Sequence, residues 1–543
     1  MNSGQMVPPV VDGTAGRTPH RRSTRATSDA VRSGRGRVAL PALASGLGLA
    51  LSLPPWGFWI LAFPAAGLLW WRLGGLRPRT RLWAGWLAGL GSFVPGLLFA
   101  RSFTLAGAAV LMALEALFFG MACLAVPRGP VVARALAFPA AMTMAEAMRQ
   151  NWPFGGLPIG GVFLGQAGGP LLGVARLGGP LGLTLAVYVG GVALAAFAMA
   201  AAQVIRRRND AADFRTLLVI GAVAMVAVVG TDIAAALAPD GGPSVGTVTA
   251  VGVQGGGVRG FSRSQVDPSV VLAAALAATA PLTHGSREKG PQLVLWPEDV
   301  VSLLGPLEGS GEEAVLSRLA MTLQATLVVG ITETLSGTAF RNEVVAFGPD
   351  GSVASRYEKV HRVPFGEYVP WRSFFAHLGN LSAVARDAVP GNGTGVLNTP
   401  VAPLGAMISY EVFYAARGRV PVRAGAELLI VPTNTSSYAT SQIPTQEIAA
   451  SQVQATQLGR DLLQAAPTGY TAWIDHRGEL LARSVLGHRQ LVPAVLQRRT
   501  GSTDYVRWGD TPALVVSLSA LVMGWSLSMR RLRRHSGRQA AYS

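Results

Sequence analysis

RYEKVHRVPFGEYVP, residues 356–370, places three side chains of different chemistry close together in the chain: the ammonium of Lys359, the imidazole of His361 and the carboxylate of Glu367. The stretch begins in a predicted strand, Ser352–Glu358. A lysine in a charged loop is usually a surface residue, so this stretch alone does not indicate a site. Whether these side chains belong to a functional site depends on two other stretches that also carry polar side chains at a predicted strand end.

In both, a short apolar strand is predicted to end on a polar group. LVLWPEDVV, residues 293–301, presents Glu298, and AMISYEVFY, residues 406–414, runs into an elbow that carries Ser409 and Glu411. A carboxylate, an ammonium and a nucleophile position on separate strand ends make a plausible acyl-transfer site. The carboxylate takes the proton of the nucleophile, and the ammonium stabilises the oxyanion.

The region around these stretches alternates short apolar strands with amphipathic helices. This pattern predicts an α/β domain whose sheets are covered on both faces, and about 260 residues suffice for one such domain. The predicted strands are Val245–Val253, Leu293–Trp296, Thr326–Thr332, Asn342–Phe347, Ser352–Glu358, Leu404–Tyr410, Glu427–Val431, Thr468–Asp475 and Leu480–Ser484. The predicted helices are Pro268–Thr283, Glu312–Gln324 and Thr445–Leu463.

The rest of the chain is too apolar for a soluble enzyme of this size. Of 543 residues, 50% are hydrophobic and only 14% are charged, so part of the chain should lie in lipid rather than form the core of a large soluble protein. Eight nearly uncharged runs are candidate membrane spans, namely Val38–Leu53, Trp56–Trp71, Leu82–Ala100, Phe103–Val126, Val131–Met148, Gly179–Ala202, Leu217–Leu237 and Thr511–Met529.

Arginine supplies most of the formal net charge of +17, and it gathers before the first span, in alternate short loops and after the last span. By the positive-inside rule, both termini are then cytoplasmic and the α/β domain is extracytoplasmic. Because the same rule already accounts for the basic charge, the charge is not evidence for nucleic-acid binding. The predicted organisation is a basic disordered tail (1–37), a membrane domain of seven helices (38–238), the α/β domain (239–505), an eighth span (510–529) and a basic tail (530–543).

The chain has one cysteine, Cys123, which falls inside the fourth predicted span. A single cysteine excludes an intrachain disulfide and a cysteine-rich metal site. We therefore expect neither a metal nor another cofactor.

The three stretches resemble the signatures of the nitrilase-type domain of apolipoprotein N-acyltransferase, a family of bacterial membrane enzymes. YEKVHRVPFGEYVP is the most specific of them, beside WPE and SYEVF. Supporting matches are VGVQGG, TNTSSY, LGRDLLQAAPTGYTAWID and, in the membrane part, EAMRQNWPFGGLP. The resemblance covers roughly residues 40 to 500. It implies an α-β-β-α sandwich of the nitrilase type on an eight-span membrane domain in the cytoplasmic membrane.

The family's reaction moves an acyl chain from a phospholipid to an active-site cysteine and then to the α-amino group of the lipid-modified N-terminal cysteine of an apolipoprotein. By this resemblance, Glu298 is the general base, Lys359 the oxyanion stabiliser and residue 409 the nucleophile. Glu367, Glu411 and Tyr410 are supporting residues. Either glutamate could orient Lys359 or could be a structural acceptor.

The chain departs from the family pattern at the nucleophile, because Ser409 stands where the family has cysteine. An alcohol is several pKa units less acidic than a thiol, and a carboxylate alone is a weak base for it. His361 could compensate as a base, or could be a loop histidine of the motif. Gln457 and Pro467 also differ from the acidic residue and the asparagine that are usual in the family.

Three functions remain open at this stage. The first is an N-acyltransferase, slowed by the serine. The second is a catalytically inactive paralogue that binds lipid or lipoprotein as a partner or modulator. The third is a nitrilase-type amidase acting on small amides, which leaves the membrane spans unexplained.

Overall fold

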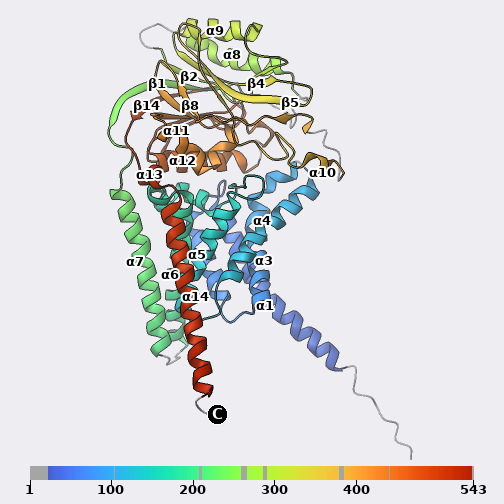
Figure 1. The fold of residues 1–543 in the computed structure, drawn as a ribbon, viewed down its shortest axis with the longest axis vertical. Helices are drawn as coiled ribbons and strands as arrows, with labels where there is room; N and C mark the ends of the chain where they lie inside the picture. The colour runs from blue at the N-terminus through green and yellow to red at the C-terminus, as the bar shows by residue number, and fades with distance from the viewer. Residues whose placement is uncertain are drawn as a thin grey trace, which may run out of the picture.

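The computed structural model of the chain describes residues 22–102, 104–206, 211–257, 266–284, 290–377, 384–438 and 441–540. A bundle of long helices carries an α/β domain on one of its ends (Figure 1). The bundle consists of α1 (Arg22–Ser52), α2 (Ala62–Arg72), α3 (Pro78–Gly96), α4 (Leu105–Ala125), α5 (Val131–Arg149), α6 (Ala175–Ile205), α7 (Ala211–Leu237) and α14 (Thr511–Ala540), with short 3-10 helices η1 (Trp59–Leu61), η2 (Leu98–Ser102), η3 (Val162–Gly168) and η4 (Pro170–Val174).

Five segments of the described bundle are long and apolar enough to cross a membrane: Leu105–Ala125, Val131–Arg149, Pro170–Ile205, Ala211–Leu237 and Thr511–Arg531. The apolar stretches of α7 and α14 are only 28% and 22% buried, as expected of helices that face lipid. The first three predicted spans coincide with α1, α2 and α3, which do not meet the same length and hydropathy. A count of eight spans stays a prediction.

The helices at the two ends of the chain extend further into the basic segments than the sequence pattern predicts. The pattern predicts a disordered tail through residue 37, but α1 already begins at Arg22; residues 1–21 of that tail lie outside the described part. Likewise α14 continues to Ala540, and residues 541–543 lie outside the described part.

The α/β domain contains two sheets. One has the strand order β14-β1-β2-β4-β5-β6, with β3 paired to β4 and β7 to β5, and the other has the order β13-β12-β11-β10-β9-β8. The strands are β1 (Ser244–Gln254), β2 (Leu293–Leu295), β3 (Val301–Leu303), β4 (Thr326–Thr334), β5 (Ala339–Phe347), β6 (Val353–Glu358), β7 (Asp387–Ala388), β8 (Val396–Asn398), β9 (Pro403–Ala406), β10 (Leu428–Pro432), β11 (Leu462–Ala465), β12 (Ala472–Ile474), β13 (Leu480–Arg483) and β14 (Gln490–Arg499).

Helices cover the outer face of each sheet, which makes the predicted α-β-β-α sandwich (Figure 1). The outer layers and linking turns are α8 (Pro268–His284), α9 (Gly311–Leu323), α10 (Arg372–Ala376), η7 (Ser409–Phe413), α11 (Ala415–Arg423), η8 (Ser436–Tyr438), α12 (Ile443–Leu458) and α13 (Asp504–Trp508). Figure 1 shows α8 and α9 at the end of the molecule far from the bundle, and α11 and α12 next to the bundle. Apolar side chains such as Leu295 and Ile430 fill the space between the sheets.

In each sheet three central strands are parallel. β1, β2 and β4 pair in parallel in the first sheet, and β9, β10 and β11 do so in the second. Parallel strands bring their carboxyl ends to one edge, where loops with polar side chains meet. The segments that carry Glu298 and Ser409 both leave the sheets at such ends.

Two predicted elements end earlier than expected. The strand predicted at Leu404–Tyr410 stops at Ala406, and Tyr410 lies in the 3-10 helix η7. The helix predicted at Thr445–Leu463 stops at Leu458, because Gly459 adopts a left-handed conformation with φ +63°. The apolar residues after it form β11, which the sequence pattern had merged with the helix.

Candidate active site

Lys359 lies at the centre of a buried charge cluster. It follows β6, and its backbone N–H donates to the carbonyl of Asn342 on β5 at 2.9 Å. Its ammonium is 1% exposed and donates to Glu298 Oε1 at 2.9 Å and to Glu367 Oε1 at 2.6 Å. Glu298 and Glu367 therefore both contact Lys359 directly, although Glu298 comes from a segment about 60 residues earlier in the chain.

Asn342 completes this cluster, and no motif in the sequence points to it. Its side-chain amide donates to Glu298 Oε1 at 2.9 Å and to Glu367 Oε1 at 3.2 Å. The only signal in the sequence is an amide at the start of an apolar strand segment, where a buried polar group must find a partner. Asn342 thus bridges the same two carboxylate oxygens that receive the lysine.

The segment that carries Glu298 turns sharply. Asp299 adopts a positive φ of +60°, and its carboxylate accepts hydrogen bonds from Ser302 at 3.1 Å and Thr332 at 3.0 Å. Gly330 on β4 passes so close that a Cβ there would lie 2.4 Å from the carbonyl oxygen of Pro297. Glu298 is therefore held by a strained turn against a backbone that only glycine allows.

Burial and mutual attraction shift the pKa values of this cluster. Burial raises the pKa of Glu298, and the nearby Lys359 opposes that rise only in part. Burial alone would lower the pKa of Lys359, but the carboxylates of Glu298 and Glu367 raise it above its usual value. Lys359 therefore remains an ammonium at neutral pH, and Glu298 is a stronger base than an ordinary carboxylate.

Ser409 is the first residue of η7 and has a positive φ of +50°. A non-glycine residue is strained in this conformation, and such residues are frequent at functional sites. The side chain is half-buried, and the described residues provide no hydrogen-bond partner for its hydroxyl. No hydrogen bond to the described residues therefore fixes the direction of this hydroxyl.

Glu411 ties the segment of Ser409 to the segment of Lys359. Its fully buried carboxylate accepts hydrogen bonds from the backbone N–H groups of Val360 at 2.8 Å, His361 at 3.0 Å and Ile408 at 2.9 Å. The hydroxyl of Tyr357 donates to both carboxylate oxygens, at 2.8 and 2.9 Å. Glu411 thus acts on the backbone around the site, whereas Glu367 contacts the lysine ammonium itself.

His361 makes a different set of contacts. Its ring stacks on Tyr414 with a centroid distance of 4.4 Å and an interplanar angle of 29°. Burial lowers its pKa, and its Nδ1 has no hydrogen-bond partner among the described residues. No hydrogen bond joins this imidazole to Ser409 in the described part of the chain, so the alternative of a serine–histidine pair has no contact to support it.

Glu447 is a buried carboxyl group to which no sequence motif points. It lies in the first turns of α12, accepts a hydrogen bond from Thr433 at 2.5 Å and is reached by the amide of Gln464 at 3.4 Å. Burial raises its pKa to about 8, and the charge of Glu298 contributes to the rise. Glu447 therefore keeps its proton at neutral pH beside the charge cluster.

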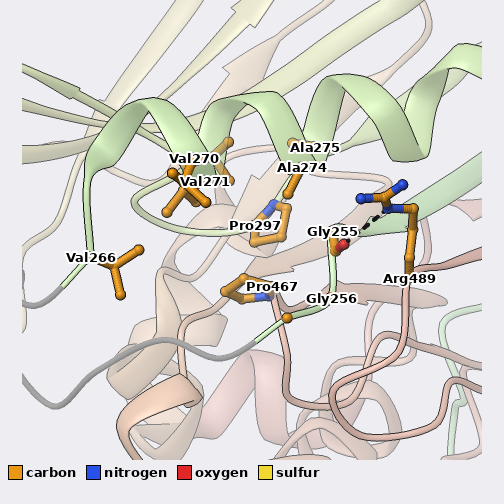
Figure 2. Close-up of a pocket in the computed structure, with 12 residues that line it drawn as sticks. Gly255, Gly256, Val266, Val270, Val271, Ala274, Ala275, Pro297, Pro467 and Arg489 are labelled. Carbon is orange, nitrogen blue, oxygen red and sulfur yellow. Dashed lines mark hydrogen bonds between the residues drawn. The ribbon is translucent and has the colours of Figure 1, made fainter.

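Gln457 and Pro467, the two further departures from the family pattern, lie apart. The side chain of Gln457 donates to Gln454 at 2.6 Å within α12. Pro467 borders a cavity of about 340 Å³ between α8 and the loops that follow β1 and β2 (Figure 2). Figure 2 shows Pro467 opposite Pro297, the residue before Glu298, with Arg489 at one side.

This cavity is mostly apolar and is a separate space from the charge cluster. Among the described residues that line it, the only charged side chain is Arg489, which donates to the carbonyl of Gly255 at 3.4 Å. Its remaining lining consists of Gly255, Gly256, Gly257, Val266, Val270, Val271, Ala274, Ala275, Pro297, Val300 and Pro467. The described part of this lining offers neither a nucleophile nor a carboxylate for acyl transfer.

Metal ligands are not grouped anywhere in the described ranges: no three His, Cys, Asp or Glu side chains lie together as a metal would need. Cys123 is fully buried in α4, inside the bundle. The candidate site therefore consists of the charge cluster around Lys359 and the elbow that carries Ser409.

Comparison with known proteins assigns this arrangement to a family. The apolipoprotein N-acyltransferase N-terminal domain model matches residues 45–193, and the carbon-nitrogen hydrolase model matches residues 264–504. Apolipoprotein N-acyltransferase from Mycolicibacterium smegmatis is 30% identical, over 91% of this chain and 87% of its own length. This chain belongs to the apolipoprotein N-acyltransferase family.

Other members of the apolipoprotein N-acyltransferase family match along nearly their whole length. The protein of that name from Azotobacter vinelandii is 30% identical and is covered over 96% of its length, and the one from Pseudomonas putida is 28% identical and is covered over 97%. The similarity spans both the helical bundle and the α/β domain. The resemblance that the sequence motifs predicted is confirmed, and so is the nitrilase-like sandwich.

Proposed function

We propose that this chain is an apolipoprotein N-acyltransferase in which Ser409 carries the acyl group. The family supports lipoprotein N-acylation at a membrane. The observation that supports catalysis by this chain is the buried cluster of Glu298, Lys359 and Glu367, because a protein that only bound lipid would have no need to keep two carboxylates and an ammonium out of water.

In the first step the acyl chain leaves a phospholipid. Glu298 takes the proton of the Ser409 hydroxyl while the Ser409 oxygen attacks the ester carbonyl of the phospholipid. The Lys359 ammonium stabilises the oxyanion that forms. The intermediate collapses to an acyl ester on Ser409. The lysophospholipid oxygen leaves with the proton that Glu298 returns.

In the second step the acyl group moves to an amine. The free α-amino group of the lipid-modified N-terminal cysteine attacks the ester carbonyl and gives a proton to Glu298, again with the oxyanion beside Lys359. The bond to Ser409 breaks, and its oxygen takes the proton back. The product carries an amide, and the site returns to its starting state without a cofactor.

Serine makes both steps slower than cysteine would. Its hydroxyl is several pKa units less acidic than a thiol, and an oxygen ester transfers its acyl group to an amine less readily than a thioester. The raised pKa of Glu298 offsets part of the low acidity of the serine hydroxyl, because a stronger base removes a proton from a weak acid more readily.

A catalytically inactive paralogue that binds lipid or lipoprotein is the second candidate function, and Ser409 is the observation that favours it. The buried cluster of Glu298, Lys359 and Glu367 would then be retained only as a structural framework. The two candidates differ in what happens when the nucleophile is exchanged.

The test uses purified protein in phospholipid micelles with a diacylglyceryl-cysteine peptide, and follows N-acylation by mass spectrometry for wild type, Ser409→Ala and Ser409→Cys. We expect slow product formation by wild type, none by Ser409→Ala and a faster reaction by Ser409→Cys. If wild type forms no product and Ser409→Cys does, the inactive-paralogue function holds. If neither forms product, acyl transfer by this site is wrong.

We also propose that the α/β domain faces the outside of the cytoplasmic membrane and that both termini are cytoplasmic, as the arginine distribution supports. Leu304, in the α/β domain, is 89% exposed. The variant Leu304→Cys should react with a membrane-impermeant maleimide on intact cells. Reaction only after the cells are broken would place the domain in the cytoplasm.

A further inference from the structure

Besides apolar packing, two side-chain hydrogen bonds join the elbow of Ser409 to the membrane part of the molecule, and both end on one carbonyl group. The hydroxyl groups of Tyr410 and Tyr414 both donate to the carbonyl oxygen of Gly156, at 3.1 and 2.8 Å. Gly156 lies in the segment between α5 and η3, which belongs to the bundle. Both tyrosines are buried, so these hydrogen bonds are shielded from water.

Arg149, the last residue of α5, holds the segment that follows Gly156. Its fully buried guanidinium donates to three consecutive backbone carbonyls, those of residues 157, 158 and 159, and the last two bonds measure 3.2 and 3.0 Å. Its remaining hydrogen bonds go to Glu146, at 2.8 and 3.0 Å, and to Glu115 at 3.2 Å. A rigid fork of donors that is satisfied on every side fixes the path of this backbone.

The backbone at Gly156 allows no side chain. Its φ is +87°, and a Cβ would lie 2.2 Å from the carbonyl of Gln150. The neighbouring Gly155 also has a positive φ, +91°, but a Cβ there would meet nothing within 4 Å. Replacing either glycine by alanine would therefore strain the backbone, but only at Gly156 would the added Cβ also clash with a neighbouring backbone atom.

We propose that Arg149 and Gly156 are positioning residues for acyl transfer: Arg149 fixes the carbonyl of Gly156, and through Tyr410 and Tyr414 this carbonyl fixes the elbow that presents residue 409 to Lys359. The inference rests on the proposed function, in which residue 409 carries the acyl group. It assigns to the membrane part a role in catalysis besides anchoring, because the nucleophile is aligned from the bundle side by Gly156 and from the sandwich side by Glu411.

The test follows alkylation of the thiol that the Ser409→Cys protein carries at position 409, which needs no acyl transfer. The unchanged chain serves as the blank, because Cys123 is fully buried. A free thiol titrates near 8.5, and a thiol held beside the charge cluster should have a displaced pH midpoint. We expect Gly156→Ala to move the midpoint toward about 8.5 and to slow alkylation at pH 7 by about tenfold.

Gly155→Ala in the same protein is the matched control and should leave both the midpoint and the rate unchanged. The double variant Tyr410→Phe, Tyr414→Phe removes only the two hydroxyls and should reproduce the effect of Gly156→Ala. A midpoint that is about 8.5 from the start, or that neither Gly156→Ala nor the double variant moves, would overturn the inference. Absence of N-acylation with cysteine at position 409 would instead count against the proposed function.

Discussion

Replacing Glu411 by glutamine should loosen the joint between the two segments that carry Lys359 and Ser409. A carboxylate offers acceptors on both oxygens, whereas an amide offers one oxygen and would turn its nitrogen toward at least one backbone N–H. If that donor is Ile408, one buried N–H loses its acceptor, at about 1–3 kcal/mol. The bonds from Val360 and His361 lose their charge assistance, at about 1 kcal/mol each.

The sum is about 4 kcal/mol, which for a domain of this size corresponds to a fall of roughly 8–16 °C in the unfolding temperature. Thermal unfolding in detergent, followed by circular dichroism or an intrinsic fluorescence signal, measures it. Glu308→Gln is the control, since Glu308 is 64% exposed and pairs only with Arg356 in the described structure, so its loss should cost less than about 1 kcal/mol. Equal unfolding temperatures for the two variants would refute the proposed tie through Glu411.

Three further changes have definite expected outcomes. Burial raises the pKa of Glu447 to about 8 from the usual 4.5, so the native state should lose about 5 kcal/mol of stability as the pH rises between these values. Glu447→Gln cannot ionise, so this decline should be absent when the free energy of unfolding is measured against pH. Parallel pH profiles would contradict it. Gly330→Ala should cost about 2 kcal/mol or more and displace Glu298, whereas Gly337→Ala, which meets nothing within 4 Å, should be neutral in the same unfolding assay. Lys359→Met leaves the buried carboxylate of Glu298 without its cation, so it should cost about 3 kcal/mol at pH 8 and less as the pH falls, because burial raises the pKa of Glu298 and a protonated group needs no cation; a loss of stability that does not depend on pH would contradict this prediction.

The strand end that carries Glu298 could be predicted because the apolar run Leu293–Trp296 stops at Pro297, whereas the end that carries Lys359 was indicated by the motif around it. The same pattern failed where apolar residues continued past the end of a helix. It extended one helix to Leu463 because it could not show that Gly459 turns left-handed, and so the central strand β11 was missed. Whether a glycine ends a helix depends on what packs against it, and that is not a local property of the sequence.

The partners of the site residues were harder to predict than the residues themselves. Asn342 and Glu447 are ordinary polar residues within a strand and a helix, and only the folding of distant segments brings them beside Glu298 and Thr433. The sequence also left the roles of the two supporting glutamates open. Their surroundings separate them, since only Glu367 contacts the Lys359 ammonium, although each also accepts hydrogen bonds from backbone N–H groups.

The uncommitted hydroxyl of Ser409 has a consequence for how this family can diversify. The described residues offer that hydroxyl no hydrogen bond, whereas the backbone beneath it is held by Glu411 and by the tyrosines of the elbow. Exchanging the side chain at position 409 among serine, cysteine and alanine should therefore leave the fold almost equally stable. Under the proposed function, one substitution at this position would change, slow or switch off the reaction, while the molecule keeps its shape and its place in the membrane.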